Sequence, residues 1–148
     1  MGKKTTGTRP EREAVKRYLQ QYHAAKQKRR ILEERRRTLS ADLRGPSTPA
    51  YRAMPSSRPV HPDGAGAVVF QIAEVEERIE AQQAEMAKAV QNVMDLIDLL
   101  PVGSTERTVV EMRHIDCKPW EQIARAVYMS RSAIFNYYNA ALDMLARN

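Results

Sequence analysis

The segment that identifies the fold most directly is residues 100–145, which read LPVGSTERTVVEMRHIDCKPWEQIARAVYMSRSAIFNYYNAALDML. It contains three short amphipathic segments with tight breaks between them. Ser104 and Thr105 are suitable residues for a helix start, and Ser130 is a suitable N-cap for the third segment, because its hydroxyl can accept a free backbone N–H in the first turn. Pro119 suits the first turn of a new helix, where its missing N–H is not needed. This order is typical of a helix-turn-helix domain.

The apolar residues of this segment predict its core. In the middle segment, four of them recur at three- and four-residue spacing and share one helix face: Trp120, Ile123, Ala124 and Val127. The third segment has its own inward stripe, formed by Ile134, Tyr137 or Tyr138, Ala141, Leu142 and Leu145. We therefore expect Trp120, Ile123 and Leu142 to be core residues of a C-terminal domain.

The other side of the third segment has an unusual composition for a solvent-facing helix, which would normally carry Glu and Lys. It carries a guanidinium group, a hydroxyl, an aromatic ring and two amides, from Arg131, Ser132, Phe135, Asn136 and Asn139. Arg can bind guanine, and Asn can pair with adenine, in the major groove of DNA. We predict that these five residues contact bases and that Lys118 and Ser130 contact phosphates. The alternative is a plain three-helix bundle whose polar face binds nothing.

The same segment resembles region 4 of the bacterial sigma-70 family, as carried by small regulators of phages and prophages. The matching residues are Leu100, Pro101, Glu106, Arg107, Val109, Arg113, Ile115, Lys118, Trp120, Glu121, Ile123, Ala124, Ser130, Ala141 and Leu142. Upstream, Thr48–Pro55 is similar to a loop often found in such phage proteins, and the acidic helix before the domain is also similar. The likeness is strongest to late-gene transcription regulators of the ArpU and RinA kind.

This resemblance implies a DNA-binding transcription regulator in the host bacterial cytoplasm, which acts on late or packaging genes. Double-stranded DNA is the expected partner, and host RNA polymerase is a further candidate. The chain departs from the family at Cys117 and Tyr128, where the family usually has Gly. Both residues fall in turns where a positive φ is often required, and a non-Gly residue there costs roughly 1 kcal/mol or more. Either the chain bears this cost, or its turns are shaped differently.

The rest of the chain predicts two long helices. After a flexible basic tail at 1–8, residues 9–43 have no Pro or Gly beyond Pro10 and form a basic helix. Residues 44–66 are rich in Pro, Ser and Gly and form a loop. Residues 67–100 form an acidic helix with seven-residue repeats. We expect an all-α protein, in which a long antiparallel, coiled-coil-like helical hairpin precedes the helix-turn-helix domain at 101–148. The heptad helix is also a candidate surface for homo-oligomer formation.

The heptad positions are specific enough to test. In the basic helix they are Tyr18, Ala25, Leu32 and Leu39, with Val15, Tyr22 and Leu43 beside them. In the acidic helix the first row is Ile72, Ile79, Met86, Val93 and Leu100, and the companion row is Val75, Gln82, Ala89 and Leu96.

Charge is unevenly distributed along the chain. Residues 1–65 hold 16 Lys and Arg against 6 Asp and Glu, residues 66–100 hold 2 against 7, and residues 101–148 hold 6 against 5. The positive surplus therefore lies far from the predicted base-reading helix. It includes Arg29, Arg30, Arg35, Arg36 and Arg37. These arginines either form a solvated face that complements the acidic helix or bind phosphates, where surplus charge gives affinity through counterion release.

Other functional classes find little support in the sequence. The single cysteine excludes an internal disulfide and a Cys-rich zinc site, and it fits a reducing cytoplasm. No catalytic, cofactor or metal-binding motif occurs, so we expect no enzyme, no cofactor and no metal. No apolar run approaches the ~18 residues of a membrane span. The alternatives are a small terminase-like packaging protein, whose DNA domain is usually N-terminal, and a helical partner-binding protein with a vestigial DNA domain.

Overall fold

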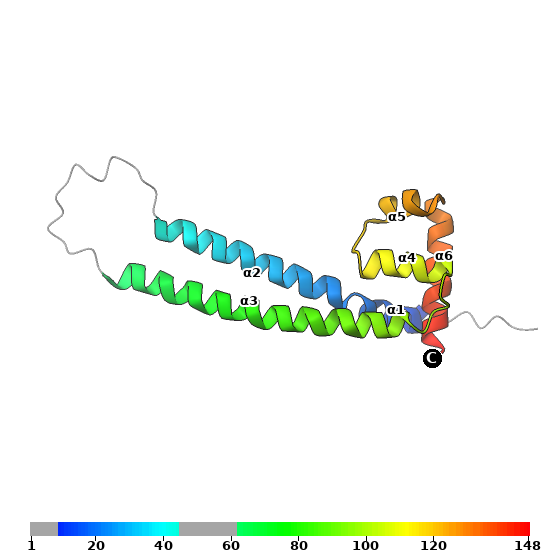
Figure 1. Cartoon of the computed structure of the whole chain (residues 1–148), viewed down its shortest axis with the longest axis horizontal. Helices are drawn as coiled ribbons and strands as arrows, with labels where there is room; N and C mark the ends of the chain where they lie inside the picture. Colours follow the sequence, from blue (N-terminus) through cyan, green and yellow to red (C-terminus); the bar gives the residue numbers. More distant parts are fainter. Residues whose placement is uncertain (1–8, 45–61) are drawn as a thin grey trace, which may run out of the picture. The chain divides into compact units, whose positions relative to one another are not determined.

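The computed structural model describes residues 9–44 and 62–148, and their regular secondary structure is entirely α-helical (Figure 1). The helices are α1 (Arg9–Leu19), α2 (Gln21–Arg44), α3 (Pro62–Ile97), α4 (Thr105–His114), α5 (Trp120–Val127) and α6 (Arg131–Ala146). The prediction of an all-α protein is confirmed for these residues. The predicted tail at 1–8, most of the predicted loop and the segment Thr48–Pro55 lie outside the described residues.

The chain divides into two compact units. The described part of unit 1 consists of residues 9–26 and 85–148, and that of unit 2 consists of residues 27–44 and 62–84. This division differs from the domain boundary expected near residue 100, because α1 and the last third of α3 belong to the same unit as α4, α5 and α6. Both α2 and α3 contribute residues to each unit.

The core of unit 1 is built around α6, which contacts α1, α4 and α5. Its buried side chains are Leu19, Val93, Ile97, Leu100, Val109, Val110, Ile123, Ile134, Tyr138, Ala141, Leu142 and Leu145. The predictions for Ile123 and Leu142 are confirmed. Trp120 is half-buried and packs against the edge of this core instead of lying within it. Of the two alternatives in the third segment, Tyr138 is the buried one and Tyr137 is half-buried.

The prediction of one continuous helix over residues 9–43 is wrong, because Gln20 separates α1 from α2. The Gln21 side-chain amide donates to the Tyr18 carbonyl at 2.9 Å, the kind of side-chain insertion that accompanies a local break. The break also shifts the apolar face. Leu19 is fully buried, whereas Tyr18, the predicted heptad residue, is 45% exposed. Leu43 is likewise exposed.

The acidic helix begins earlier than predicted. α3 starts at Pro62, five residues before the expected start at 67, so residues 62–66 are helical and the predicted loop is too long at this end. Pro62 is compatible with this start because a proline in the first helical turn loses no hydrogen bond. Each of the nine side chains in the predicted heptad rows is buried or half-buried. The predicted end of the helix at residue 100 is wrong, because α3 ends at Ile97 and Leu100 therefore lies outside it.

Unit 2 has a much smaller core. Its segments of α2 and α3 lie side by side, because Ile31 and Leu32 of one and Ala81 and Gln82 of the other line a common groove. Ile79 is its one buried hydrophobic side chain among the described residues. Several other large apolar side chains of this unit are exposed, namely Ile31, Leu43, Val69 and Phe70.

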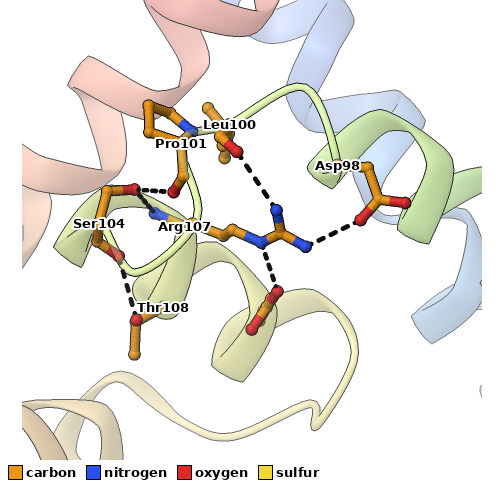
Figure 2. A network of polar contacts seen from close by, with 7 residues as sticks. Asp98, Leu100, Pro101, Ser104, Arg107 and Thr108 are labelled. Carbon is orange, nitrogen blue, oxygen red and sulfur yellow. Dashed lines mark hydrogen bonds and ion pairs between the residues drawn. The ribbon is translucent and has the colours of Figure 1, made fainter.

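A network around Arg107 fixes the connection between α3 and α4 (Figure 2). Its guanidinium donates to Asp98 at 2.8 Å, to Glu111 at 2.9 Å and to the Leu100 carbonyl at 3.3 Å. Ser104 caps α4 as predicted, since its hydroxyl accepts the Arg107 backbone N–H at 3.2 Å. The turn between them passes through Gly103 at a φ of 76°, a conformation that glycine adopts without strain.

Candidate nucleic-acid interface

Ser130 and the first turn of α6 form the start of the surface that the sequence predicts to bind DNA. Ser130 has an extended backbone, and its hydroxyl accepts the Ala133 N–H at 3.2 Å, so the predicted N-cap is confirmed. The first turn of α6 contains no acidic residue, unlike those of α4 and α5. The only carboxylate of α6 is Asp143, which lies toward its C-terminal end. The N-terminal part of α6 therefore presents donors and positive charge without a competing anion.

The five residues predicted to contact bases do not share one environment. Arg131, Ser132 and Asn136 are exposed, whereas Phe135 and Asn139 are half-buried. The Phe135 ring lies 4.8 Å from that of Trp120, and the Arg131 guanidinium lies 5.7 Å from the Phe135 ring. Phe135 thus joins α6 to α5 and supports Arg131 by a cation–π contact. It is not the freely solvent-facing ring that the sequence predicts.

The two residues predicted to contact phosphates also differ from each other. Ser130 is exposed, but its hydroxyl already serves as the helix cap. Lys118 is half-buried, and its carbonyl accepts a hydrogen bond from Arg113 at 3.1 Å. The Arg113 guanidinium also lies 4.6 Å from the Trp120 ring. Arg113 therefore fixes the α4–α5 connection and the start of α5 together.

The two departures from the family pattern have the backbone conformation that glycine normally supplies. Cys117 has a φ of 54° and Tyr128 a φ of 55°. At the end of α5, the Met129 N–H bonds to the Ala124 carbonyl at 3.1 Å and the Tyr128 N–H bonds to the Arg125 carbonyl at 3.4 Å. This is the bonding pattern of a helix C-terminus closed by a left-handed residue. Both residues therefore adopt the positive φ and bear its conformational cost.

A buried polar pair behind this surface is not evident from the sequence. His114 Nε2 lies 2.8 Å from the Tyr138 hydroxyl, and both side chains are buried. Burial lowers the pKa of His114 to about 4, with a further contribution from the charge of Arg113, so the imidazole is neutral at pH 7. Burial also raises the pKa of Tyr138 to about 12, so its hydroxyl stays protonated. The pair connects the end of α4 to the middle of α6.

A second unpredicted contact joins α1 to the far end of α6. The Arg12 guanidinium binds both carboxylate oxygens of Asp143, at 2.6 and 2.8 Å. The hydrogen bond to Asp143 is the main cause of a raised Arg12 pKa. These residues are 131 positions apart in the sequence, so no local pattern could have indicated the pair. The contact pairs Asp143, the single carboxylate of α6, which lies near the opposite end of the helix from Arg131.

The arginines of α2 lie in unit 2. Arg29 and Arg30 pair with Glu33 at 3.2 Å and Glu34 at 3.7 Å, which are glutamates of the same helix. Arg35, Arg36 and Arg37 are exposed. Arg35 also borders the groove between α2 and α3.

Neither a membrane span nor a metal centre occurs within residues 9–44 and 62–148. None of the helices there combines the length and the apolar character that crossing a membrane requires. These residues also contain no group of three or more His, Cys, Asp and Glu side chains that could hold a metal ion. Comparison of the whole chain with protein-family models, with curated proteins and with solved structures gives no match.

Proposed function

We propose that the chain is a sequence-specific DNA-binding transcription regulator of a phage or prophage, similar to sigma region 4, that controls late or packaging genes. In this proposal α4, α5 and α6 form a helix-turn-helix domain, and α6 enters the major groove. The observation that carries the proposal is the exposure of Arg131, Ser132 and Asn136 on the N-terminal part of α6. This part of the helix has no carboxylate, and Ile134 and Tyr138 of the same helix are buried in the core and hold it in place.

The chemistry of this face favours DNA over plain solvation. An exposed helix that only meets water gains solubility and helix-stabilising pairs from Glu and Lys. An arginine and an asparagine instead offer the two side chains that pair bidentately with guanine and adenine. The N-terminal residues of a recognition helix are the ones that meet base edges, which fits the positions of Arg131 and Ser132.

The roles of α2 and α3 follow from this proposal. They would form an antiparallel hairpin, in which Arg35, Arg36 and Arg37 add phosphate contacts to a base-reading domain that is nearly neutral. The net charge of residues 101–148 is only +1, so affinity for a polyanion needs help from elsewhere in the chain.

A partner-binding role is the second candidate, and one observation favours it. Phe70 is 78% exposed and Val69 is 52% exposed on α3, in a unit with little core of its own. Exposed apolar side chains that gather on one element often mark an interaction site. The partner could be a second copy of the chain or host RNA polymerase. Sedimentation of the full chain over a concentration range would distinguish self-association from a free surface.

The decisive experiment measures DNA selection and the effect of two single substitutions. The full chain should enrich particular duplexes from a random pool at moderate salt. Arg131→Ala and Asn136→Ala should each weaken binding to the selected duplex by ~1–3 kcal/mol and relax discrimination at one position. Arg78→Ala is the matched control, because Arg78 is an exposed arginine of α3 paired with Glu74. If the wild type binds no duplex, or if both variants retain its sequence preference, the proposal is wrong.

A further inference from the structure

Tyr128, in the turn between α5 and α6, is the most exposed aromatic residue described in the chain. Its side chain and backbone together are 94% exposed, and it has φ and ψ angles of 55° and 43°. A phenol ring exposed to this extent contributes almost nothing to the packing of unit 1. Residues with a side chain avoid this left-handed conformation, which glycine adopts freely. The fold therefore gains nothing from the tyrosine side chain and would be less strained without it.

A strained residue that does not help to pack the fold often has a functional contact with another molecule, and Tyr128 is such a residue. Two positively charged neighbours lie on either side of Tyr128 in the sequence. Arg125 is exposed in the last turn of α5, and Arg131 is exposed in the first turn of α6. No aspartate or glutamate occurs between Gln122 and Leu142. The nearest carboxylate in α5 is Glu121, in its first turn and so at the opposite end of that helix.

We infer that the Tyr128 hydroxyl donates a hydrogen bond to a phosphate of the DNA duplex that α6 binds, beside a phosphate neutralised by Arg125. This inference rests on the proposed function and adds a backbone contact to it. A phosphate is the fitting target because Tyr128 precedes the Ser130 cap by two residues and so lies outside the helix that would enter the groove. Hydroxyl side chains commonly contact phosphate oxygens, where they set the position of the protein on the duplex. The positive charge of Arg125 and Arg131 complements the same backbone.

The test compares four variants of the full chain on a duplex selected by the wild type and on an unselected duplex of equal length. Tyr128→Phe removes only the hydroxyl and leaves the backbone conformation unchanged. It should weaken binding to both duplexes by the same factor, about tenfold, with no change in melting temperature. A neutral hydroxyl releases no counterion, so the slope of log K against log salt should not change. Arg125→Gln should instead make that slope shallower by roughly 0.9.

Tyr128→Gly and Cys117→Gly form a matched pair, because both relieve a left-handed residue at almost the same φ. Each should raise the melting temperature of unit 1, but only Tyr128→Gly should weaken DNA binding. Opposite changes in stability and affinity cannot come from a purely structural role. Wild-type affinity in Tyr128→Phe would overturn the inference, even if Tyr128→Gly binds more weakly. Failure of the wild type to bind either duplex would instead reject the proposed function.

Discussion

Unit 1 and unit 2 are both made of helices, but they bury side chains very differently. In unit 1, helices from both ends of the chain surround α6 and bury twelve side chains in one cluster. In the described part of unit 2, two helical segments lie side by side and bury Ile79 alone among the hydrophobic residues. Two helices can shield only a single narrow stripe from water, whereas several helices around one can shield it on most sides.

The difference indicates a division of labour. Unit 1 has enough buried apolar surface to hold α6 and its exposed residues in one defined position, and the proposed contacts to bases would require such a position. In unit 2, pairs at four-residue spacing such as Arg29–Glu33 and Arg78–Glu74 stabilise the individual helices. Each such pair within a helix contributes only a few tenths of a kcal/mol. Three predictions test whether the two units really differ in this way.

The largest expected effect is the loss of a core side chain in unit 1. Ile134 is fully buried on the inner face of α6, so Ile134→Ala should lower the free energy of unfolding by about 2–5 kcal/mol. The same truncation at Ile79 should cost at most about 2 kcal/mol, because a two-helix layer can close over the gap or admit water. Urea denaturation followed by circular dichroism measures both. Phe70→Ala, at a side chain that is 78% exposed, is the control and should change stability by less than about 0.5 kcal/mol. Equal losses at Ile134 and Ile79 would contradict the comparison.

The next effect is a pH dependence confined to unit 1. The pKa of His114 is about 4 in the fold, below its ordinary value of 6.5. As the pH falls from 6.5 to 4, the unfolded chain takes up a proton that the folded chain does not, so stability falls over this window. The full loss should be on the order of 3 kcal/mol, at 1.36 kcal/mol for each unit of pKa shift.

Replacement of the imidazole checks this assignment. His114→Gln removes the titrating group and keeps a side chain that can bond to the Tyr138 hydroxyl. Its stability should depend less on pH between 6.5 and 4 than that of the wild type, in denaturant titrations at fixed ionic strength. The same slope in both proteins would mean that another group titrates in this window.

The smallest effect on stability is expected in unit 2, on the exposed face of α2. Arg35, Arg36 and Arg37, changed together to Gln, should alter stability by at most ~1 kcal/mol for each exposed pair. If they bind phosphates, affinity for all duplexes should fall alike, and the salt slope should become shallower by roughly 0.9 for each phosphate that the variant no longer binds. Arg29 and Arg30 provide the comparison, because Glu33 and Glu34 already neutralise part of their charge. Their change to Gln should alter the slope less. An unchanged slope in the triple variant, with its circular dichroism spectrum intact, would reject the phosphate role.

Local patterns predicted the features that depend on neighbouring residues. The caps at Ser104 and Ser130 were predictable because each needs only its own hydroxyl and an N–H three residues later. The heptad rows of α3 were predictable because a helix repeats its faces at fixed spacing. The same reasoning failed at Tyr18, because the heptad count assumes an unbroken helix and the interruption at Gln20 changes which side chain faces inward.

The sequence by itself therefore determined the all-α structure of the described residues, the caps of α4 and α6, the heptad rows of α3 and the absence of carboxylates from the first part of α6. Only the tertiary structure decided that Arg12 binds Asp143, that His114 bonds to Tyr138 and that α1 belongs to the same unit as α6. The physical reason is the distance along the sequence over which each interaction acts. Caps and helix faces arise from interactions within one or two turns, whereas these pairs depend on how helices distant in the sequence pack around a shared core. Tyr128 combines both, because the sequence placed it in a turn where a positive φ is often required, but only the structure showed that it adopts this backbone and that its ring is exposed.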